Sequence, residues 1–285
     1  MSAILDRRHI GRALFRHGVL LVGVFLVAFP VWVAFVASTL SLPEIRSVPM
    51  PLLPGDKGFE TWWGVLTQGG GRLSQKTPVL DMLGHSLVMA LCVAAGKIAI
   101  SFTSAFAIVY FRFPLRMFFF WMIFVTLMLP VEVRILPTFE VVANLGLLDS
   151  YGGLIVPLIA SATATFLFRQ FFMTVPKELV EAARVDGAGP LRFLWSILVP
   201  LSVTNIAALF VVLFIYGWNQ YLWPLLVTKK LETIVVGVYR LLAVGDDSVD
   251  WPAVMATTML AMLPPVAVVI LMQRWFVKGL VETEK

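Results

Sequence analysis

Charged side chains are scarce in this sequence: Asp, Glu, Lys and Arg together make up 14% of its 285 residues. Soluble domains have about a quarter of their residues charged. Hydrophobic residues, by contrast, account for 59% of the chain. A globular domain of this composition would have too little polar surface to stay dissolved. The composition therefore excludes an ordinary soluble protein and predicts a polytopic membrane protein.

Cysteine and histidine are also too few for the common catalytic and metal sites. The single cysteine, Cys92, excludes an intrachain disulfide, and the three histidines are scattered near the ends of apolar runs. Residues 69–77 superficially suggest a phosphate loop but lack the Gly-Lys-Ser/Thr ending. We therefore expect no catalytic residues, no metal site and no cofactor in this chain, and any ATP hydrolysis would belong to a separate subunit.

Long apolar runs are what the sequence has in abundance. A membrane helix needs about 20 largely apolar residues, and only helices satisfy their own backbone in lipid for segments of this kind. The predicted fold is all-α, a single transmembrane domain over residues 1–285 with six transmembrane helices. The predicted spans are residues 17–39, 84–110, 117–137, 151–168, 200–225 and 253–273.

Two features set the orientation and the loops. The uncharged run 193–227 is too long for one span, so we expect its start to lie along the membrane surface, with Pro200 marking the turn inward. Lysine and arginine are more frequent in the segments on the side of the N-terminus, and basic residues mark the cytoplasmic side. We therefore expect cytoplasmic termini and an outer loop over residues 40–83, with one short helix near Trp62 and Trp63. Topology alone accounts for the net charge of +5, and no nucleic acid is expected as a partner.

A few polar residues fall inside or beside the predicted spans, where a charge costs about 2.5–3.5 kcal/mol on insertion scales. Lys97 is a candidate pathway residue, although it could instead pair with a carboxylate of a neighbouring subunit or snorkel. Glu132 and Arg134 flank the outer end of the third span as candidate gate residues or as structural partners. Asn219 and Gln220 lie in an aromatic run that suits either the pathway or an interfacial belt.

The segment 174–192 is short, charged and compatible with a helix, although it lies between long apolar runs. Glu178 and Glu181 fall in the first turns of this helix, where carboxylates suit the helix dipole, and Gly187 suits its end. Ala182 and Ala183 would leave a small, smooth face able to enter a groove on a partner. On these residues alone, a surface helix that merely links two spans is equally compatible.

The wider spacing favours docking. Glu181-Ala182-Ala183 is followed after three residues by Gly187, and later by Ile197 and Pro200. This pattern resembles the cytoplasmic coupling motif of ABC-importer permeases, although the leucine usual before the final proline is Val199 here. The phrases at residues 111–116, 126–134, 161–172 and 214–221 resemble the carbohydrate-importer permeases of the maltose type, in particular the second permease subunits of bacterial sn-glycerol-3-phosphate importers.

The resemblance implies a type I ABC importer in the bacterial inner membrane. A second, different permease would complete the pathway, an ATPase homodimer would carry ATP and Mg, and an extracytoplasmic binding protein would deliver sn-glycerol-3-phosphate. It also implies that Glu181, Ala182, Ala183 and Gly187 dock on the ATPase. Glycerophosphodiesters or a neutral sugar are alternative substrates. A secondary transporter would need membrane-embedded carboxylates, of which only Glu132 is near, and a membrane scaffold would need no docking helix.

Overall fold

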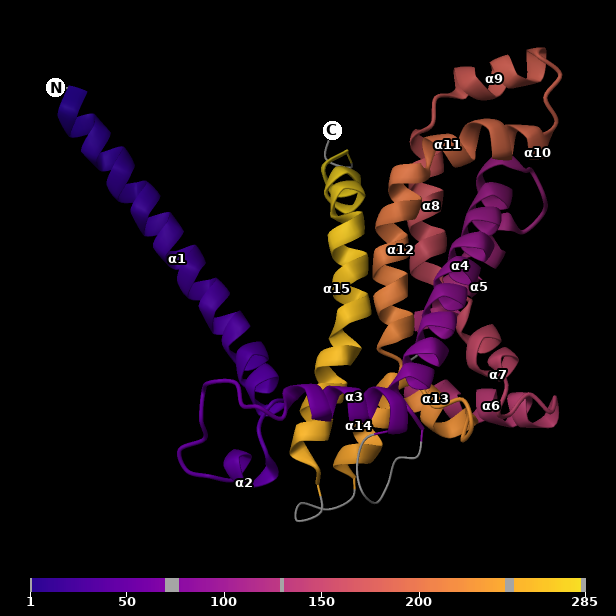
Figure 1. The fold of residues 1–285 in the computed structure, drawn as a ribbon. Coiled ribbons are helices and arrows are strands. Elements are labelled where there is room, and N and C mark those ends of the chain that lie inside the picture. The colour runs from indigo at the N-terminus through magenta and orange to yellow at the C-terminus, as the bar shows by residue number, and fades with distance from the viewer. Residues whose placement is uncertain (1, 70–76, 129–130, 244–248, 283–285) are drawn as a thin grey trace. The chain divides into compact units, whose positions relative to one another are not determined.

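The computed structural model describes residues 2–69, 77–128, 131–243 and 249–282, and every regular element in these ranges is a helix (Figure 1). The contacts divide the chain into two units. The first comprises Met1–Val79 and Val238–Leu260, and the second comprises Leu80–Gly237 and Ala261–Lys285. The expected all-α architecture is therefore confirmed for the described residues.

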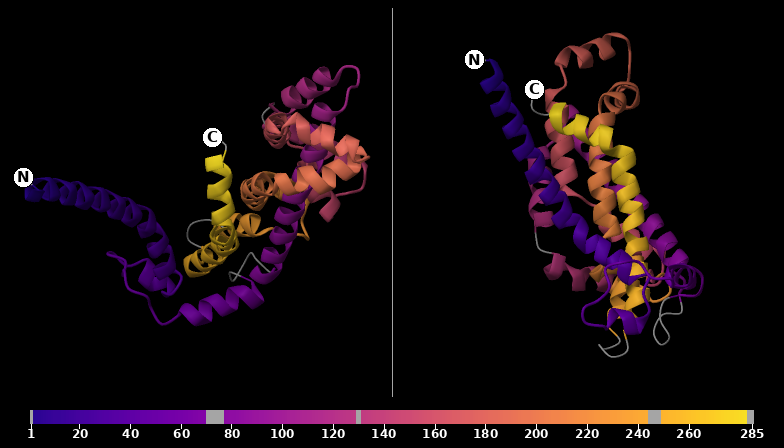
Figure 2. Two further views of the ribbon diagram at one scale, coloured as in Figure 1. Left: turned by 90° about the horizontal axis from the view of Figure 1, so that it is seen from above. Right: turned by 60° about the vertical axis from the view of Figure 1, so that its left-hand side comes forward.

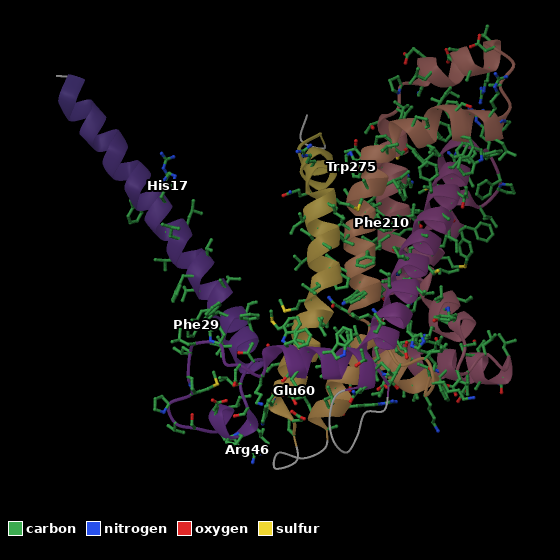
Figure 3. The ribbon with its side chains drawn as sticks, viewed as in Figure 1. His17, Phe29, Arg46, Glu60, Phe210 and Trp275 are labelled. Atoms are coloured by element: carbon green, nitrogen blue, oxygen red, sulfur yellow. The ribbon has the colours of Figure 1, made fainter. Side chains whose placement is uncertain are left out.

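The first helix, α1 (Ser2–Ala37), contains the stretch Phe15–Ala37, which is long and apolar enough to cross a membrane. Nearly all side chains of this stretch before its last turn are exposed, and Figure 3 shows His17 and Phe29 projecting from it. A helix that is apolar all round is stable only in an apolar environment. Lipid or another apolar chain must therefore cover the exposed part of this stretch.

The segment after α1 folds back on the end of that helix. Two short helices follow, α2 (Leu42–Ile45) and α3 (Gly58–Gln68). The indole Nε1 of Trp62 donates to the hydroxyl of Ser38 over 3.0 Å, which ties α3 to the end of α1. The predicted short helix around Trp62–Trp63 is therefore confirmed.

Three helices of the described residues are each long and apolar enough to cross a membrane: Phe15–Ala37, Val79–Tyr110 and Trp251–Trp275. The number rises to at most five if each of two bent pairs counts as one span. The count of six spans stays a prediction. The helices that contain the second and third of these stretches are α4 (Val79–Tyr110) and α15 (Trp251–Glu282).

The two bent pairs are the predicted fourth and fifth spans. Residues Tyr151–Leu158 and Ala162–Thr174 meet at 48°, and residues Pro190–Leu201 and Val203–Trp218 meet at 74°. The second bend lies at Ser202, two residues beyond Pro200, so the predicted turn is confirmed near its expected place. The elements of these pairs are α7 (Tyr151–Ile155), η1 (Val156–Leu158), α8 (Ala162–Thr174), α10 (Pro190–Phe193), η2 (Leu194–Leu198), α11 (Val199–Leu201) and α12 (Val203–Trp218).

The region predicted as the third span contains two helices rather than one continuous helix. They are α5 (Arg116–Met128) and α6 (Val131–Asn144), and residues 129–130 between them lie outside the described residues. The sequence has Pro130 at this point, and a proline lacks the N–H that a helix interior needs. The predicted span 200–225 likewise extends past the end of α12 into a separate helix, α13 (Leu222–Val227).

An aromatic cluster joins α4 and α8. The ring of Phe102 meets the rings of Phe168 and Phe172 edge-on, with centroids 5.0 and 4.9 Å apart. Edge-to-face pairs at this separation add about 0.5–1.5 kcal/mol beyond their area burial. Residues of α9 (Lys177–Val185) and of α10 pack on the same cluster. The cluster therefore fixes the predicted docking segment to the membrane helices.

The end of α8 and α12 that lies away from α9 is next to the connection between α13 and α14 (Ile234–Leu242) (Figure 1). The Asp149 carboxylate binds the backbone of this connection. It accepts the backbone N–H groups of Lys229 and Lys230 and the hydroxyl of Thr228. The two backbone hydrogen bonds hold the pKa of Asp149 below its ordinary value of 3.8. A lowered folded pKa contributes stability that is present above the ordinary value and is lost as the pH falls through the folded pKa.

We therefore expect Asp149→Asn to lower the melting temperature of the detergent-solubilised protein at neutral pH. The variant should also lose less further stability than the wild type between about pH 5 and about pH 2. The exposed Asp56 makes none of these contacts, so Asp56→Asn should keep the wild-type acid profile. Identical pH profiles of wild type and Asp149→Asn would contradict the proposed contribution of this carboxylate.

Candidate functional site

The predicted docking segment forms a separate helix at one end of the second unit. Helix α9 (Lys177–Val185) follows the C-terminus of α8 and precedes α10, and it lies beyond the ends of α8 and α12 in Figure 1 and in the right-hand view of Figure 2. The helix starts after Pro176, which is its N-cap. The segment 174–192 therefore contains a short polar helix at one end of the membrane-length helix α4.

Helix α9 has an inner and an outer face. Ala183 is only 6% exposed and packs with the partly buried Val180 against the aromatic cluster of α4 and α8. Glu181, Ala182 and Val185 are exposed. The structure thus separates the predicted docking residues. Glu181 and Ala182 are free to meet another subunit, whereas Ala183 holds α9 against its own chain.

Gly187 ends α9 in a Schellman motif. Its φ angle is +71°, and its N–H donates to the carbonyl of Arg184 over 3.0 Å. The N–H of Ala188 donates to the carbonyl of Ala183 over 2.8 Å, which completes the motif. The prediction that Gly187 stops the helix is confirmed. A cavity of about 500 Å³ lies beside this turn, between α9 and the end of α4, with Arg112 and Arg184 among its lining residues.

Lys97 lies in the middle of α4 and is 6% exposed. Its ammonium nitrogen donates to the carbonyl of Ala160 over 3.1 Å and lies 4.4 Å from the centre of the Tyr216 ring. One turn further, the Ser101 hydroxyl donates to the carbonyl of Ser161 over 3.2 Å. These carbonyls belong to the break between η1 and α8. Two α4 side chains therefore satisfy the backbone at the bend.

Several other polar side chains share a cavity with Lys97. This cavity has a volume of about 90 Å³, and its lining includes Arg134, Thr138, Tyr216 and Gln220. The structure thus brings together three of the predicted pathway residues, Lys97, Arg134 and Gln220. Such an arrangement of two cations, a hydroxyl and an amide can bind an anionic group.

Comparison of the sequence with known protein families identifies the family of this chain. Residues 97–282 match the family described as "Binding-protein-dependent transport system inner membrane component", and this match covers more than half of the chain. The chain belongs to this family. In the family, the ATPase is a separate subunit and the matching chains are transport components, so this chain is a multi-pass inner-membrane permease subunit of an ABC importer.

Relatives within the binding-protein-dependent permease family cover nearly the whole chain. A protein of Rhizobium meliloti (strain 1021) is 58% identical over 99% of this chain and 100% of its own length. Proteins of Brucella melitensis and Pectobacterium atrosepticum are 59% and 57% identical, over 94% and 96% of this chain and over 96% and 98% of their own lengths. All three are named sn-glycerol-3-phosphate transport system permease protein UgpE.

A solved structure supports the same fold. A chain of a bacterial ABC transporter involved in the import of the acidic polysaccharide alginate superposes with a TM-score of 0.76, over 95% of this chain and 98% of that one. Its sequence identity of 22% limits this likeness to the fold. The predicted type I importer permease fold is confirmed.

Two of the predicted pathway residues, Asn219 and Glu132, are not among the described residues that line the Lys97 cavity. Asn219 is the exposed C-cap of α12 and is not among the cavity's lining residues. Glu132 lies in the first turn of α6, but its side chain is outside the part of the chain that the structure describes. The pathway assignment of both residues stays a prediction.

Sequence reasoning missed Thr138 and the carbonyl of Ala160 and assigned Tyr216 only to an aromatic belt. Two of these had a signal. Thr138 follows Arg134 by four residues, so the two share a face of α6. Tyr216 precedes Gln220 by four residues, and although Gln220 lies beyond the end of α12, its side chain reaches back to the Tyr216 carbonyl. The Ala160 carbonyl had none, because a backbone group becomes available only where the helix breaks.

Proposed function

We propose that this chain forms half of the translocation pathway of an ABC importer for sn-glycerol-3-phosphate. The observation that carries the proposal is 58% identity, over 99% of the chain, with a permease named for this substrate. A second, different permease would form the other half. An ATPase homodimer and an extracytoplasmic binding protein would complete the importer in the membrane lipid.

Helix α9 is proposed as the site that docks on the ATPase. Glu181 and Ala182 are exposed on its outer face, so they can enter a groove of the partner directly. Ala183 and Gly187 would act by position: the first packs α9 on the aromatic cluster, and the second ends the helix in a fixed turn. A movement of the ATPase would then pass through α9 to α4 and α8.

The orientation follows from the same assignment. The ATPase works in the cytoplasm, so α9, the loop 111–116 and both termini would be cytoplasmic. The region 40–83 would face outward and contribute to binding-protein docking. ATP and Mg would bind to the ATPase homodimer, whose closure and reopening would rock the permease helices between inward-facing and outward-facing states.

The first test is the ATPase activity of the reconstituted importer, assembled with both permeases, the ATPase and the binding protein. We expect sn-glycerol-3-phosphate to stimulate hydrolysis, and glycerophosphocholine and maltose to have no effect. Stimulation only by another of these ligands would overturn the substrate and keep the importer. Failure of the chain to co-purify with any ATPase would favour a secondary transporter or a scaffold instead.

A further inference from the structure

The cavity around Lys97 is a second candidate site, because the Lys97 ammonium group has no carboxylate partner among the described residues. The described residues that line its cavity include two cations, Lys97 and Arg134, and no carboxylate. The neutral partners of Lys97, the Ala160 carbonyl and the Tyr216 ring, offset its charge only in part. A buried charge without a counter-charge is costly. An anion in the cavity would remove that cost.

The cavity also supplies the hydrogen bonds that a phosphate group requires. An ammonium group has three donors, and the Ala160 carbonyl occupies one of them, so two remain for a ligand. Arg134 offers a planar fork suited to phosphate oxygens. The cavity volume of about 90 Å³ is several times the ~10–15 Å³ that one water molecule needs. A small anionic group therefore fits.

We propose that the cavity of Lys97 and Arg134 is an anion subsite of the translocation pathway that binds the phosphate group of a small phosphomonoester. This inference rests on the proposed function and adds the residues that recognise the charged end of the substrate. Thr138 and Gln220 line the same space and are placed to contact the polyol end. Because Lys97 also holds the break before α8, a bound phosphate would contact the bend of that helix pair directly.

The test replaces the charge and then restores it. Lys97→Cys is made in a Cys92→Ser background, which removes the only native thiol. In the reconstituted importer we expect glycerol-3-phosphate uptake to fall by about tenfold or more, the effect of losing one charged hydrogen bond. Treatment with 2-aminoethyl methanethiosulfonate, which attaches an ammonium group, should restore part of the uptake. The anionic sulfonatoethyl reagent should not restore it.

A second measurement tests whether a ligand occupies the cavity, independently of transport, from the rate at which the introduced thiol is modified. At concentrations raised to offset the weaker binding, glycerol-3-phosphate and inorganic phosphate held by Arg134 should slow modification of the introduced thiol, whereas glycerol should not. Lys57→Cys in the same background, with the binding protein left out of this measurement, is the matched control, because Lys57 is an exposed lysine that pairs with Glu60 over 3.5 Å. Its modification should proceed at the same rate with and without each ligand.

The outcomes separate this inference from the proposed function. If the wild type takes up glycerol-3-phosphate and Lys97→Cys takes it up at the same rate, the inference is overturned and the proposed function stands. Lost uptake that the aminoethyl reagent does not restore would also overturn it, because Lys97 would then act only through the fold. Absence of wild-type glycerol-3-phosphate uptake would overturn the proposed substrate, and protection by inorganic phosphate would still support the anion subsite.

Discussion

A Gly187→Pro variant is expected to assemble in the membrane and to lose substrate uptake, while the ATPase continues to hydrolyse ATP. Gly187 has a φ angle of +71° and donates its N–H to the carbonyl of Arg184. Proline fixes φ near −65° and has no N–H. It therefore cannot form the turn that ends α9. Loss of this turn would misplace Glu181 and Ala182 relative to the ATPase.

A graded series at this position separates backbone strain from crowding. An added Cβ would meet no atom within 4 Å, so the size of the new side chain is not the cause of any loss. Asparagine tolerates the left-handed region, whereas a β-branched residue there is a genuine outlier. We expect Gly187→Asn to retain most uptake, Gly187→Val to lose much of it and Gly187→Pro to lose nearly all.

The measurement is the ratio of substrate imported to ATP hydrolysed in proteoliposomes that contain the complete importer. Co-purification of the second permease and the ATPase controls for assembly. Full uptake by a stably assembled Gly187→Pro variant would contradict the docking role of α9.

The docking helix was predictable because its signals are local. Glu178 in the first turn of α9 and Gly187 just past its end lie within one short segment, and the Schellman turn follows from the glycine. The inward direction of Ala183 was not predictable. A small alanine face suits a partner's groove and the chain's own core equally well, and only the packing against the aromatic cluster decides between them.

The Lys97 cavity was predictable only in part. Lys97, Arg134 and Gln220 attract notice because charged or amide groups are unusual inside apolar runs. Their meeting in one cavity depends on the packing of α4, α6 and α12, which no local pattern encodes. The Ala160 carbonyl became a partner of Lys97 only because the fourth predicted span bends at that point.

Among the substitutions considered, Gly153→Ala is expected to lower the free energy of unfolding most. An added Cβ at Gly153 would overlap the carbonyl oxygen of Leu147, and a backbone atom cannot rotate away as a flexible side chain can. Gly153 also accepts a hydrogen bond from the indole N–H of Trp223 over 3.1 Å, which joins α7 to α13. Relief of the overlap would therefore displace both helices. We expect destabilisation of about 3 kcal/mol or more, at the upper end of overpacking effects.

The neighbouring glycine provides a matched control for this prediction. At Gly152 an added Cβ would approach the Leu147 side chain at 3.4 Å and the Ser150 hydroxyl at 3.5 Å, and both are ordinary contacts with side-chain atoms. Because alanine is favoured over glycine in a helix by about 0.8–1.0 kcal/mol, Gly152→Ala should leave the melting temperature unchanged or raise it. Thermal unfolding of both variants in detergent distinguishes the two positions. Equal melting of the two variants would show that the chain relaxes at Leu147 without loss. Trp223 also lines the Lys97 cavity. Adding Gly153→Ala to the Lys97→Cys variant in the Cys92→Ser background should therefore remove the protection of the introduced thiol by phosphate.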